Sequence, residues 1–180
     1  MRNLVLVLFC AAIVTSCTKK PEEQTAAPVV TETKPAPVEI ADPKYTEIGK
    51  AFSANLSSGD IDAMMASYAD NAVYVWSSGD SLSGKQAIID YWKERRGKVI
   101  ETITYPNSVW LPIKVNQPQS VEAPGTWLLA WNQVAVKYKN GKELSFWSHS
   151  DYHFNNNDKI DRVIQYIDRA PINAALASKK

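Results

Sequence analysis

The chain has 180 residues, of which 45% are hydrophobic and 22% are charged, and its formal net charge is +1. This near-neutral balance, without a cluster of Lys and Arg interleaved with aromatic residues, argues against nucleic acid as a partner. The only cysteines are Cys10 and Cys17. The residues after Cys17 therefore have no disulfide, no thiolate metal site and no cysteine nucleophile.

The first 16 residues have the pattern of a secretory signal. Met1-Arg2-Asn3 is a short basic start, residues 4–14 are almost wholly apolar, and small residues follow. An apolar run of about 11 residues is too short to cross a bilayer as a helix, which needs about 20. We therefore expect residues 1–16 to be removed as a signal peptide.

The segment Val14-Thr15-Ser16-Cys17 stands directly after this apolar run. It resembles the lipobox of bacterial lipoproteins, in which the cysteine becomes the lipid-bearing N-terminus. The resemblance implies a lipidated Cys17 that anchors the chain by more than one acyl chain. It places the chain in the bacterial cell envelope, with the outer membrane as the expected location, facing the periplasm or the cell surface. The alternative is an ordinary signal peptide in which Cys17 is incidental.

Residues 17–43 are rich in Pro, Thr, Ala, Glu and Lys and contain no aromatic residue. Such a segment cannot bury enough apolar surface to offset the entropy of ordering. We predict a disordered tether that holds the following domain away from the membrane. Residues 44–175 are expected to form one globular domain with one core, and residues 176–180 a tail.

The domain begins with helical periodicity. Gly59 is a stop signal for the first helix, Asp60 is the expected cap of the second, and Ser83 that of the third. The expected elements are helices over 45–56, 61–68 and 84–96, with a short strand over 72–76 between the second and the third.

After Gly97 the pattern changes to that of strands. Asn140-Gly141 predicts a tight hairpin turn. The expected strands cover 99–115, with interruptions at Pro106 and Pro112, then 126–138, 143–154 and 160–168. Helices followed by an antiparallel meander indicate the α+β class.

Two stretches resemble the SnoaL-like, NTF2-like superfamily. The first reads Tyr68-Ala69-Asp70-Asn71-Ala72-Val73-Tyr74, then Gly84-Lys85-Gln86-Ala87-Ile88 and Trp92; the second reads Tyr152-His153-Phe154, Lys159-Ile160 and Tyr166-Ile167-Asp168. Asp158 stands where the family usually has glycine. The resemblance covers about residues 44–170. It implies an NTF2-like cone, in which about three N-terminal helices pack on a curved antiparallel sheet around an apolar pocket. Isomerases, cyclases, hydrolases and binding modules share this cone, so it does not decide function.

Asp168 is the catalytic candidate that the resemblance implies. In the polyketide-cyclase branch, an Asp in the last strand acts as general acid/base next to a carbonyl. A carboxylate in an apolar pocket would have a raised pKa, suited to proton transfer. Tyr166, on the same strand face, could donate a hydrogen bond to a developing enolate oxygen. The alternative is that Asp168 ends the strand and pairs with Arg169 or a turn amide.

His149, Asp151 and His153 alternate along one strand, so their side chains point the same way. Such a set could bind a divalent metal or relay a proton. The opposite face resembles the core, since it carries Phe146, Tyr152 and Phe154. We therefore predict no metal site and no cofactor. We interpret His153 as a solvent or dimer-face residue, and His149 as the better cavity candidate, assisting Asp168.

The six tryptophans are many for one small domain, and most must belong to the core. The ligand-binding candidates are Trp76, Trp127, Trp131 and Tyr152. Three hypotheses follow. The first is a membrane-anchored domain that binds a small apolar or aromatic molecule in its pocket. The second is an isomerase- or cyclase-type enzyme that uses Asp168, and the third is a non-catalytic module that forms a homodimer through its sheet.

Overall fold

The computed structural model describes residues 34–118 and 123–177. From Lys34 the chain forms a compact unit of its own. The predicted signal peptide, Cys17 and the tether up to residue 33 lie outside the described residues, as do residues 178–180 of the predicted tail.

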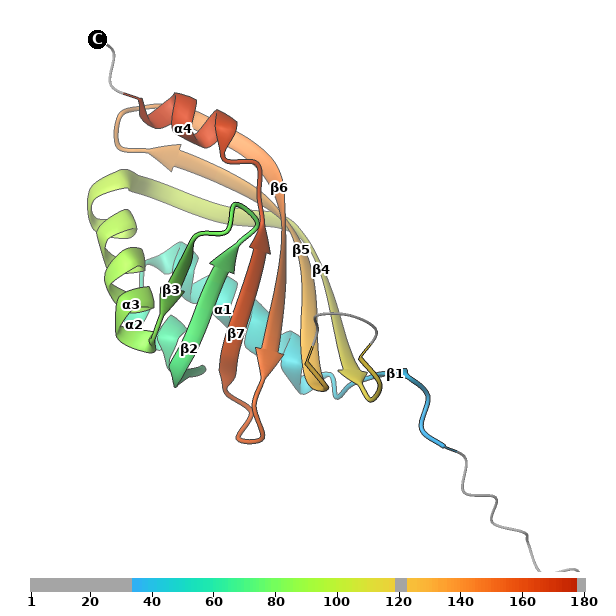
Figure 1. Cartoon of the computed structure of the whole chain (residues 1–180). Helices are drawn as coiled ribbons and strands as arrows, with labels where there is room; N and C mark the ends of the chain where they lie inside the picture. Colours follow the sequence, from blue (N-terminus) through green and yellow to red (C-terminus); the bar gives the residue numbers. More distant parts are fainter. Residues whose placement is uncertain (1–33, 119–122, 178–180) are drawn as a thin grey trace, which may run out of the picture. The chain divides into compact units, whose positions relative to one another are not determined.

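Helices α1, α2 and α3 lie on one side of a curved sheet, and α4 lies at the end of the β5–β6 hairpin (Figure 1). The helices are α1 (Lys44–Ser58), α2 (Ile61–Met65), α3 (Lys85–Glu94) with a π-helical turn at Arg95–Val99, and α4 (Ala170–Leu176). The strands are β1 (Val38–Ile40), β2 (Tyr68–Trp76), β3 (Ser81–Ser83), β4 (Ile100–Val115), β5 (Gly125–Tyr138), β6 (Glu143–Phe154) and β7 (Ile160–Tyr166).

The first two helix boundaries follow the predicted signals. Gly59 ends α1 in the left-handed conformation, with φ of 86°, which glycine adopts without a steric cost. The Asp60 side chain accepts a hydrogen bond from the Ala63 amide at 2.9 Å and caps α2. The third boundary differs from the prediction. Ser83 belongs to β3, and Gly84 precedes α3 without a side-chain cap.

The strand order in the sheet is β1-β4-β5-β6-β7-β2-β3. Neighbouring strands are antiparallel except for β2 and β7, which pair in parallel, with Tyr74 beside Val163. The prediction of a wholly antiparallel sheet is therefore corrected to a mixed sheet. The parallel pair joins two strands that are far apart in the chain. Strand β2 comes before α3, whereas β7 follows the meander of β4, β5 and β6.

The second predicted helix, over 61–68, ends as α2 at Met65, and the strand predicted over 72–76 already begins as β2 at Tyr68. Two elements near the ends of the domain also differ from the prediction. The end of the predicted tether is ordered, because residues 38–40 add strand β1 to the edge of β4, with Ile40 opposite Ile113. Backbone hydrogen bonds to an open strand edge order this segment, and composition alone does not reveal them. Helix α4 was not predicted; it follows Asp168 and places Ile172 in the core.

The core lies between the helices and the face of the sheet turned toward them, here called the inner face. Strand β6 shows the division clearly. Ser148, Ser150, Tyr152 and Phe154 are buried on the inner face, whereas the residues between them are half-buried on the outer face. This alternation decides which candidate residues can reach the interior of the cone.

Candidate functional site

An enclosed cavity of about 60 Å³ lies between the inner face of the sheet and helices α1 and α3. At ~30 Å³ per molecule it has room for about two waters. Its lining comes from α1, α3 and strands β2, β4, β5, β6 and β7. The cavity is therefore the interior of the cone.

Four polar side chains form what we call the polar floor of the cavity: Asn132, Ser148, Ser150 and Gln165. The register places Asn132 opposite Ser148, and Ser150 opposite Gln165. Asn132 is only 4% exposed, and its Oδ1 has no hydrogen-bond partner among the described residues. Because a buried polar atom without a partner is unfavourable, the floor favours occupation by water or by a polar group of a ligand.

Aromatic side chains wall the cavity above this floor: Phe52, Tyr74, Trp92, Tyr105 and Tyr152. Burial raises the pKa of Tyr152 to about 12, against a weaker opposite effect of its hydrogen bond with Ser150. Burial also raises the pKa of Tyr74 and of Tyr105. All three hydroxyls therefore stay protonated near neutral pH. The described lining contains no carboxylate, imidazole, amine or guanidinium group.

Asp168 does not line this cavity. It is exposed, and its Oδ1 accepts a hydrogen bond from the Ala170 amide at 2.9 Å, at the start of α4. The chain has left β7 at Tyr166, so Asp168 occupies a turn. The structure therefore places it in the position of the alternative reading, as a residue that ends the strand and binds a turn amide.

His149 and Tyr166 lie on the outer face of the sheet, away from the cavity. The His149 ring stacks between Trp131, at 4.5 Å between ring centroids, and Tyr166, at 5.7 Å. Its Nδ1 lies 3.1 Å from the Ala130 carbonyl oxygen, and its Nε2 lies 2.7 Å from Asp151 Oδ1. Burial raises the pKa of Asp151, and the neighbouring His149 opposes this shift.

His153 has a similar environment further along the same face. Its Nδ1 lies 2.5 Å from Asp161 Oδ1, and its ring packs on Trp127. The carboxylates beside the two histidines are different residues, so the histidines do not converge on one point. Within residues 34–118 and 123–177, no three His, Cys, Asp or Glu side chains are placed to hold a metal ion.

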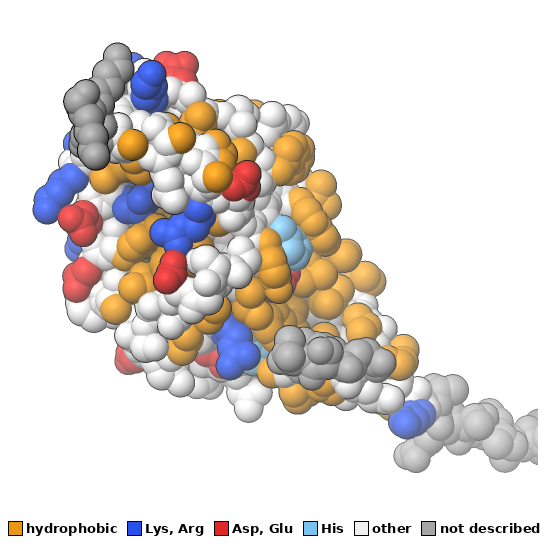
Figure 2. Space-filling view, turned by 45° about the horizontal axis from the view of Figure 1, so that its top comes forward, with side chains coloured by type: hydrophobic (Ala, Val, Ile, Leu, Met, Phe, Trp, Pro, Cys, Tyr) orange, Lys and Arg blue, Asp and Glu red, His pale blue; other side chains and the backbone are white. Residues whose placement is uncertain are grey.

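The large apolar residues that the outer face exposes form what we call the outer patch: Val109, Leu111, Trp131, Trp147 and Tyr166, each 37–56% exposed. Figure 2 shows hydrophobic side chains gathered along one side of the domain, with a histidine among them. An antiparallel sheet with a solvated face normally carries polar residues there, so this patch is a candidate interface.

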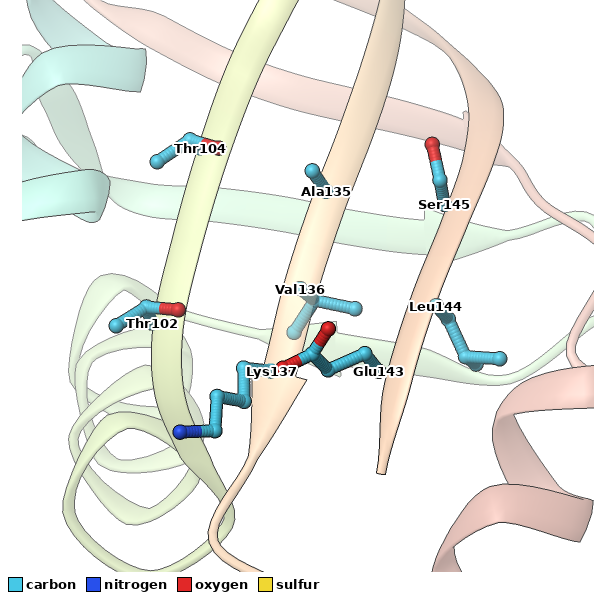
Figure 3. A pocket seen from close by; sticks show the side chains of 8 residues that line it. All are labelled: Thr102, Thr104, Ala135, Val136, Lys137, Glu143, Leu144 and Ser145. Carbon is cyan, nitrogen blue, oxygen red and sulfur yellow. The ribbon is translucent and has the colours of Figure 1, made fainter. Parts of the chain in front are cut away.

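An open depression of about 410 Å³ crosses strands β4, β5 and β6 (Figure 3). Its side chains are mixed, with Thr102 and Thr104 on one border and Lys137 and Glu143 at one end. Lys137 is already paired with Glu101 at 3.0 Å. The depression has neither the walls nor the unpaired buried groups of the enclosed cavity, which remains the better candidate site.

The family profile described as the SnoaL-like domain matches residues 50–163. The chain belongs to the SnoaL-like family. No curated protein matches the chain. The family match confirms the resemblance inferred from the two sequence stretches.

Solved structures share the fold of this SnoaL-like domain. A proposed polyketide cyclase from Xanthomonas campestris pv. campestris is 18% identical, with a TM-score of 0.59 over 73% of this chain and 96% of its own. A proposed isomerase from Bacillus subtilis is also 18% identical, with a TM-score of 0.57 over 73% and 91%. An LEH-like epoxide hydrolase from M. tuberculosis is 16% identical, with a TM-score of 0.51 over 72% and 82%. These similarities confirm the NTF2-like α+β fold with a curved, mixed sheet.

The predicted ligand-binding residues of the SnoaL-like domain divide between the two faces. Tyr152 lines the cavity, and Trp76 lies beside it, since its Nε1 donates a hydrogen bond to Gln165 Oε1 at 3.0 Å. Trp127 and Trp131 lie on the outer face, opposite His153 and His149. Two of the four candidates therefore face away from the cavity.

Sequence reasoning missed the polar floor. Asn132, Ser148 and Ser150 sit at positions of β5 and β6 that alternate with outward residues, between apolar neighbours on the same face. Their signal was the interruption of an apolar inner face by small polar residues. These residues lie inside long strands, where they neither cap a helix nor form a turn. Polar residues that interrupt an apolar strand face in this way indicate a cavity.

Proposed function

We propose that this SnoaL-like domain binds a small uncharged molecule in its cone, with no acid–base chemistry. The observation that carries the proposal is the lining of the cavity, in which unpaired polar groups meet aromatic walls and the described residues supply no carboxylate or imidazole. A ligand with one polar end would satisfy Asn132 Oδ1 and place its apolar part against Trp92 and Phe52. Binding modules and enzymes share this fold, so the support for binding comes from the lining and not from the fold.

The size of the cavity limits the ligand. Drug-sized molecules occupy pockets of roughly 300–1,000 Å³, whereas this cavity measures about 60 Å³. A steroid-sized or polycyclic ligand therefore does not fit. We expect molecules of a few heavy atoms, such as small alcohols, amides and ketones.

The test is ligand-observed NMR with a panel of small alcohols, amides and ketones, using wild type and Asn132→Leu. Leucine keeps the branching and the number of side-chain heavy atoms of Asn132 and removes its hydrogen bonds. Leaving a ligand group unpaired costs about 1–3 kcal/mol, so we expect affinity to fall roughly 5- to 160-fold. Trp131→Leu, on the outer face, is the matched control and should bind as wild type does. Equal binding by wild type and Asn132→Leu would overturn the proposal.

The enzyme hypothesis has a simple test at Asp168. Because its carboxylate caps a turn at the surface, Asp168→Asn should leave any turnover of a carbonyl substrate unchanged. A loss of turnover without a loss of stability would restore Asp168 as the general base.

We further propose that Cys17 carries the lipid anchor, with the domain held at the cell envelope and residues 1–16 removed. The support is the sequence Val14-Thr15-Ser16-Cys17 after an apolar run. No described helix is long and apolar enough to span a membrane. Cys17→Ala should move the protein out of the membrane fraction, and globomycin should raise its apparent size. Wild-type protein in the soluble fraction would contradict the anchor.

A second role, favoured by the outer patch, is self-association into a homodimer. The patch is apolar, and Asp151 within it is paired with His149, so two copies can face each other without repulsion between like charges. Analytical ultracentrifugation should give a dimer for wild type and a monomer for Trp147→Lys. Ala54→Lys, at an exposed position of α1, is the control. A monomeric wild type would exclude this role.

A further inference from the structure

The enclosed cavity adjoins an open groove on the surface of the domain. The groove, of about 310 Å³, lies between α1 and β4 and includes Lys50, Ala54 and Trp110. Ser53 and Tyr105 line both the groove and the cavity. Only these two side chains are shared by the two linings, so they separate the cavity from the groove.

Next to these two side chains, the wall between the cavity and the groove contains an irregular stretch of β4. The pairing of β4 with β5 shifts register between Thr104 and Asn107. Tyr105 and Pro106 fall in the shift, and proline has no amide hydrogen to donate to a neighbouring strand. Tyr105 is thus held less firmly by the sheet than its neighbours on β4.

The two side chains that separate the cavity from the groove differ in size and in freedom to move. Ser53 is small and 7% exposed, so it leaves space beside α1. Tyr105 is half-buried, and its hydroxyl makes no hydrogen bond with the described residues. Its ring can therefore turn without breaking a hydrogen bond, and burial keeps its hydroxyl protonated by raising its pKa.

The parts of the wall that α1 provides are fixed. Leu56 and Phe52 of α1 belong to the core, at 1% and 6% exposure. One turn before Ser53, Gly49 packs so closely on β4 that an added Cβ would lie 2.7 Å from Trp110 Cζ3. Helix α1 cannot approach or rotate at this contact, so access to the cavity on this side requires movement of a side chain.

We propose that ligands reach the cavity through a port between Ser53 and Tyr105, and that the Tyr105 ring is its gate. The port admits small uncharged molecules, because it leads past the half-buried Tyr105 ring and a serine to a described cavity lining without charged groups. The inference rests on the proposed binding function. Its test measures access to the cavity and requires no ligand.

The experiment uses the full chain with Cys10 and Cys17 replaced by serine, so that an introduced thiol is the only one. Ser150→Cys places that thiol on the polar floor, and methyl methanethiosulfonate labels it at a rate followed by mass spectrometry. Adding Tyr105→Ala should accelerate labelling about tenfold or more, the change that a barrier lower by ~1.4 kcal/mol produces. Adding Ser53→Phe should slow it by a similar factor. Ala51→Phe, at an exposed position of α1 that lines neither the groove nor the cavity, should have no effect.

A second reporter separates the port from global unfolding. Ala72 is fully buried and does not line the cavity, so Ala72→Cys is labelled only when the domain unfolds. Slower labelling of Ala72→Cys than of Ser150→Cys supports the port, as does the opposite response to Tyr105→Ala and Ser53→Phe. Equal labelling rates for the two reporters would overturn the port. So would a labelling rate at Ser150→Cys that changes with neither Tyr105→Ala nor Ser53→Phe. A ligand-binding failure with the port responses intact would instead overturn the binding function alone.

Discussion

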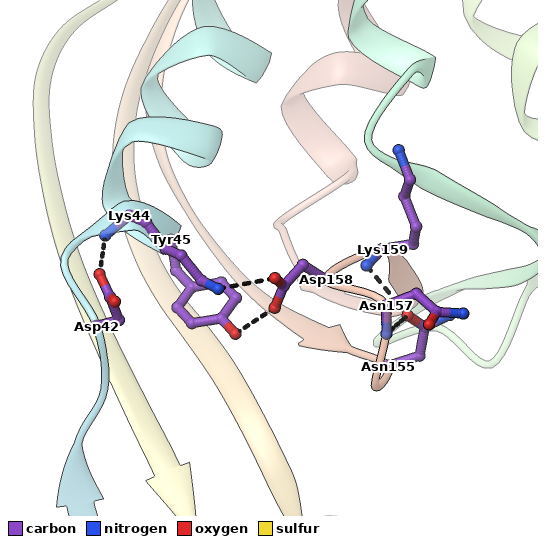
Figure 4. Close-up of polar contacts among 7 residues, drawn as sticks. All are labelled: Asp42, Lys44, Tyr45, Asn155, Asn157, Asp158 and Lys159. Atoms are coloured by element: carbon purple, nitrogen blue, oxygen red, sulfur yellow. Dashed lines mark hydrogen bonds and ion pairs between the residues drawn. The ribbon is translucent and has the colours of Figure 1, made fainter.

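Asp158 occupies a backbone conformation that few residues adopt. Its φ is 56°, and among the described residues it alone combines a positive φ with a side chain. Aspartate tolerates this left-handed region better than most residues. Its carboxylate accepts hydrogen bonds from Lys44 Nζ at 2.7 Å and from the Tyr45 hydroxyl at 2.6 Å (Figure 4). The residue that departs from the family's glycine thus joins the β6–β7 turn to the start of α1.

We predict that Asp158→Asn lowers the melting temperature in a pH-dependent way. The hydrogen bonds from Lys44 and Tyr45 lower the pKa of Asp158 in the folded state. The stabilisation is therefore present above the unfolded-state pKa of about 3.9 and is lost as the pH falls through the lower folded-state value. Thermal unfolding should show a difference between variant and wild type at pH 7 that disappears in acid. A difference that stays constant with pH would contradict the role of the charge.

Residue roles could be predicted only as far as strand alternation holds. The pattern correctly placed His149, Asp151 and His153 on one face, and Phe146, Tyr152 and Phe154 on the opposite, core-like face. It could not place Asp168, because alternation ends where β7 ends, at Tyr166. The sequence shows single polar residues that interrupt an apolar face. That they come together as the polar floor depends on the register of β5 with β6, which a single sequence does not contain.

At the scale of elements, Gly49 sets the distance between α1 and β4. Alanine favours a helix over glycine by about 0.5–1 kcal/mol. The added methyl group, however, would meet Leu128 Cδ2 and Trp110 Cζ3, each at 2.7 Å. The leucine end can shift, whereas the indole ring is held between α1 and the sheet.

We therefore predict that Gly49→Ala destabilises the domain by about 1–3 kcal/mol, the usual effect of overpacking a core. Urea unfolding measures this change. Gly97→Ala is the matched control, since nothing lies within 4 Å of a Cβ added there; it should be neutral or slightly stabilising. Recovery of stability in Gly49→Ala combined with Trp110→Leu would identify the ring as the cause. Equal stability of Gly49→Ala and wild type would refute the packing argument.

Elements were predictable in proportion to their length. Strands β4, β5 and β6 carry long alternating patterns between clear turn signals, and their predicted bounds differ from the observed ones by a residue or less. Strands β1 and β3 have three residues each, too few for a periodic signal. Helix α4 has only seven residues, is rich in alanine and has a proline as its second residue, so its sequence gives a weak helical signal. The parallel pairing of β2 with β7 joins segments far apart in the chain, so no local pattern indicates it.

At the scale of the whole molecule, the same strands serve two faces. Strand β6 turns Ser150 into the cavity and His149 and Asp151 onto the outer face. Strand β7 lies between β6 and β2 and pairs with both by backbone hydrogen bonds. The cavity and the outer patch therefore depend together on the last strand.

A chain that ends at Lys159, without β7 and α4, should lose cooperative unfolding. Its β2 and β6 would each have an unpaired edge, and the core would lose Val163 and Ile172. Near-ultraviolet circular dichroism and urea titration should show no single transition. A chain that ends at residue 177 keeps every described element and is the control. Retention of a cooperative transition by the shorter chain would show that β7 is dispensable.

The parallel pairing of β2 with β7 also bears on the order in which the chain folds. Strand β2 is made early in synthesis, but its partner β7 is made only after β4, β5 and β6. Pairings between distant segments form slowly, so the first half of the domain cannot complete its sheet while the chain is still growing. For a protein that we propose to be exported, this delay is useful. Under that proposal, slow pairing of β2 with β7 would keep the chain unfolded during export, so that the domain folds after it has crossed the membrane.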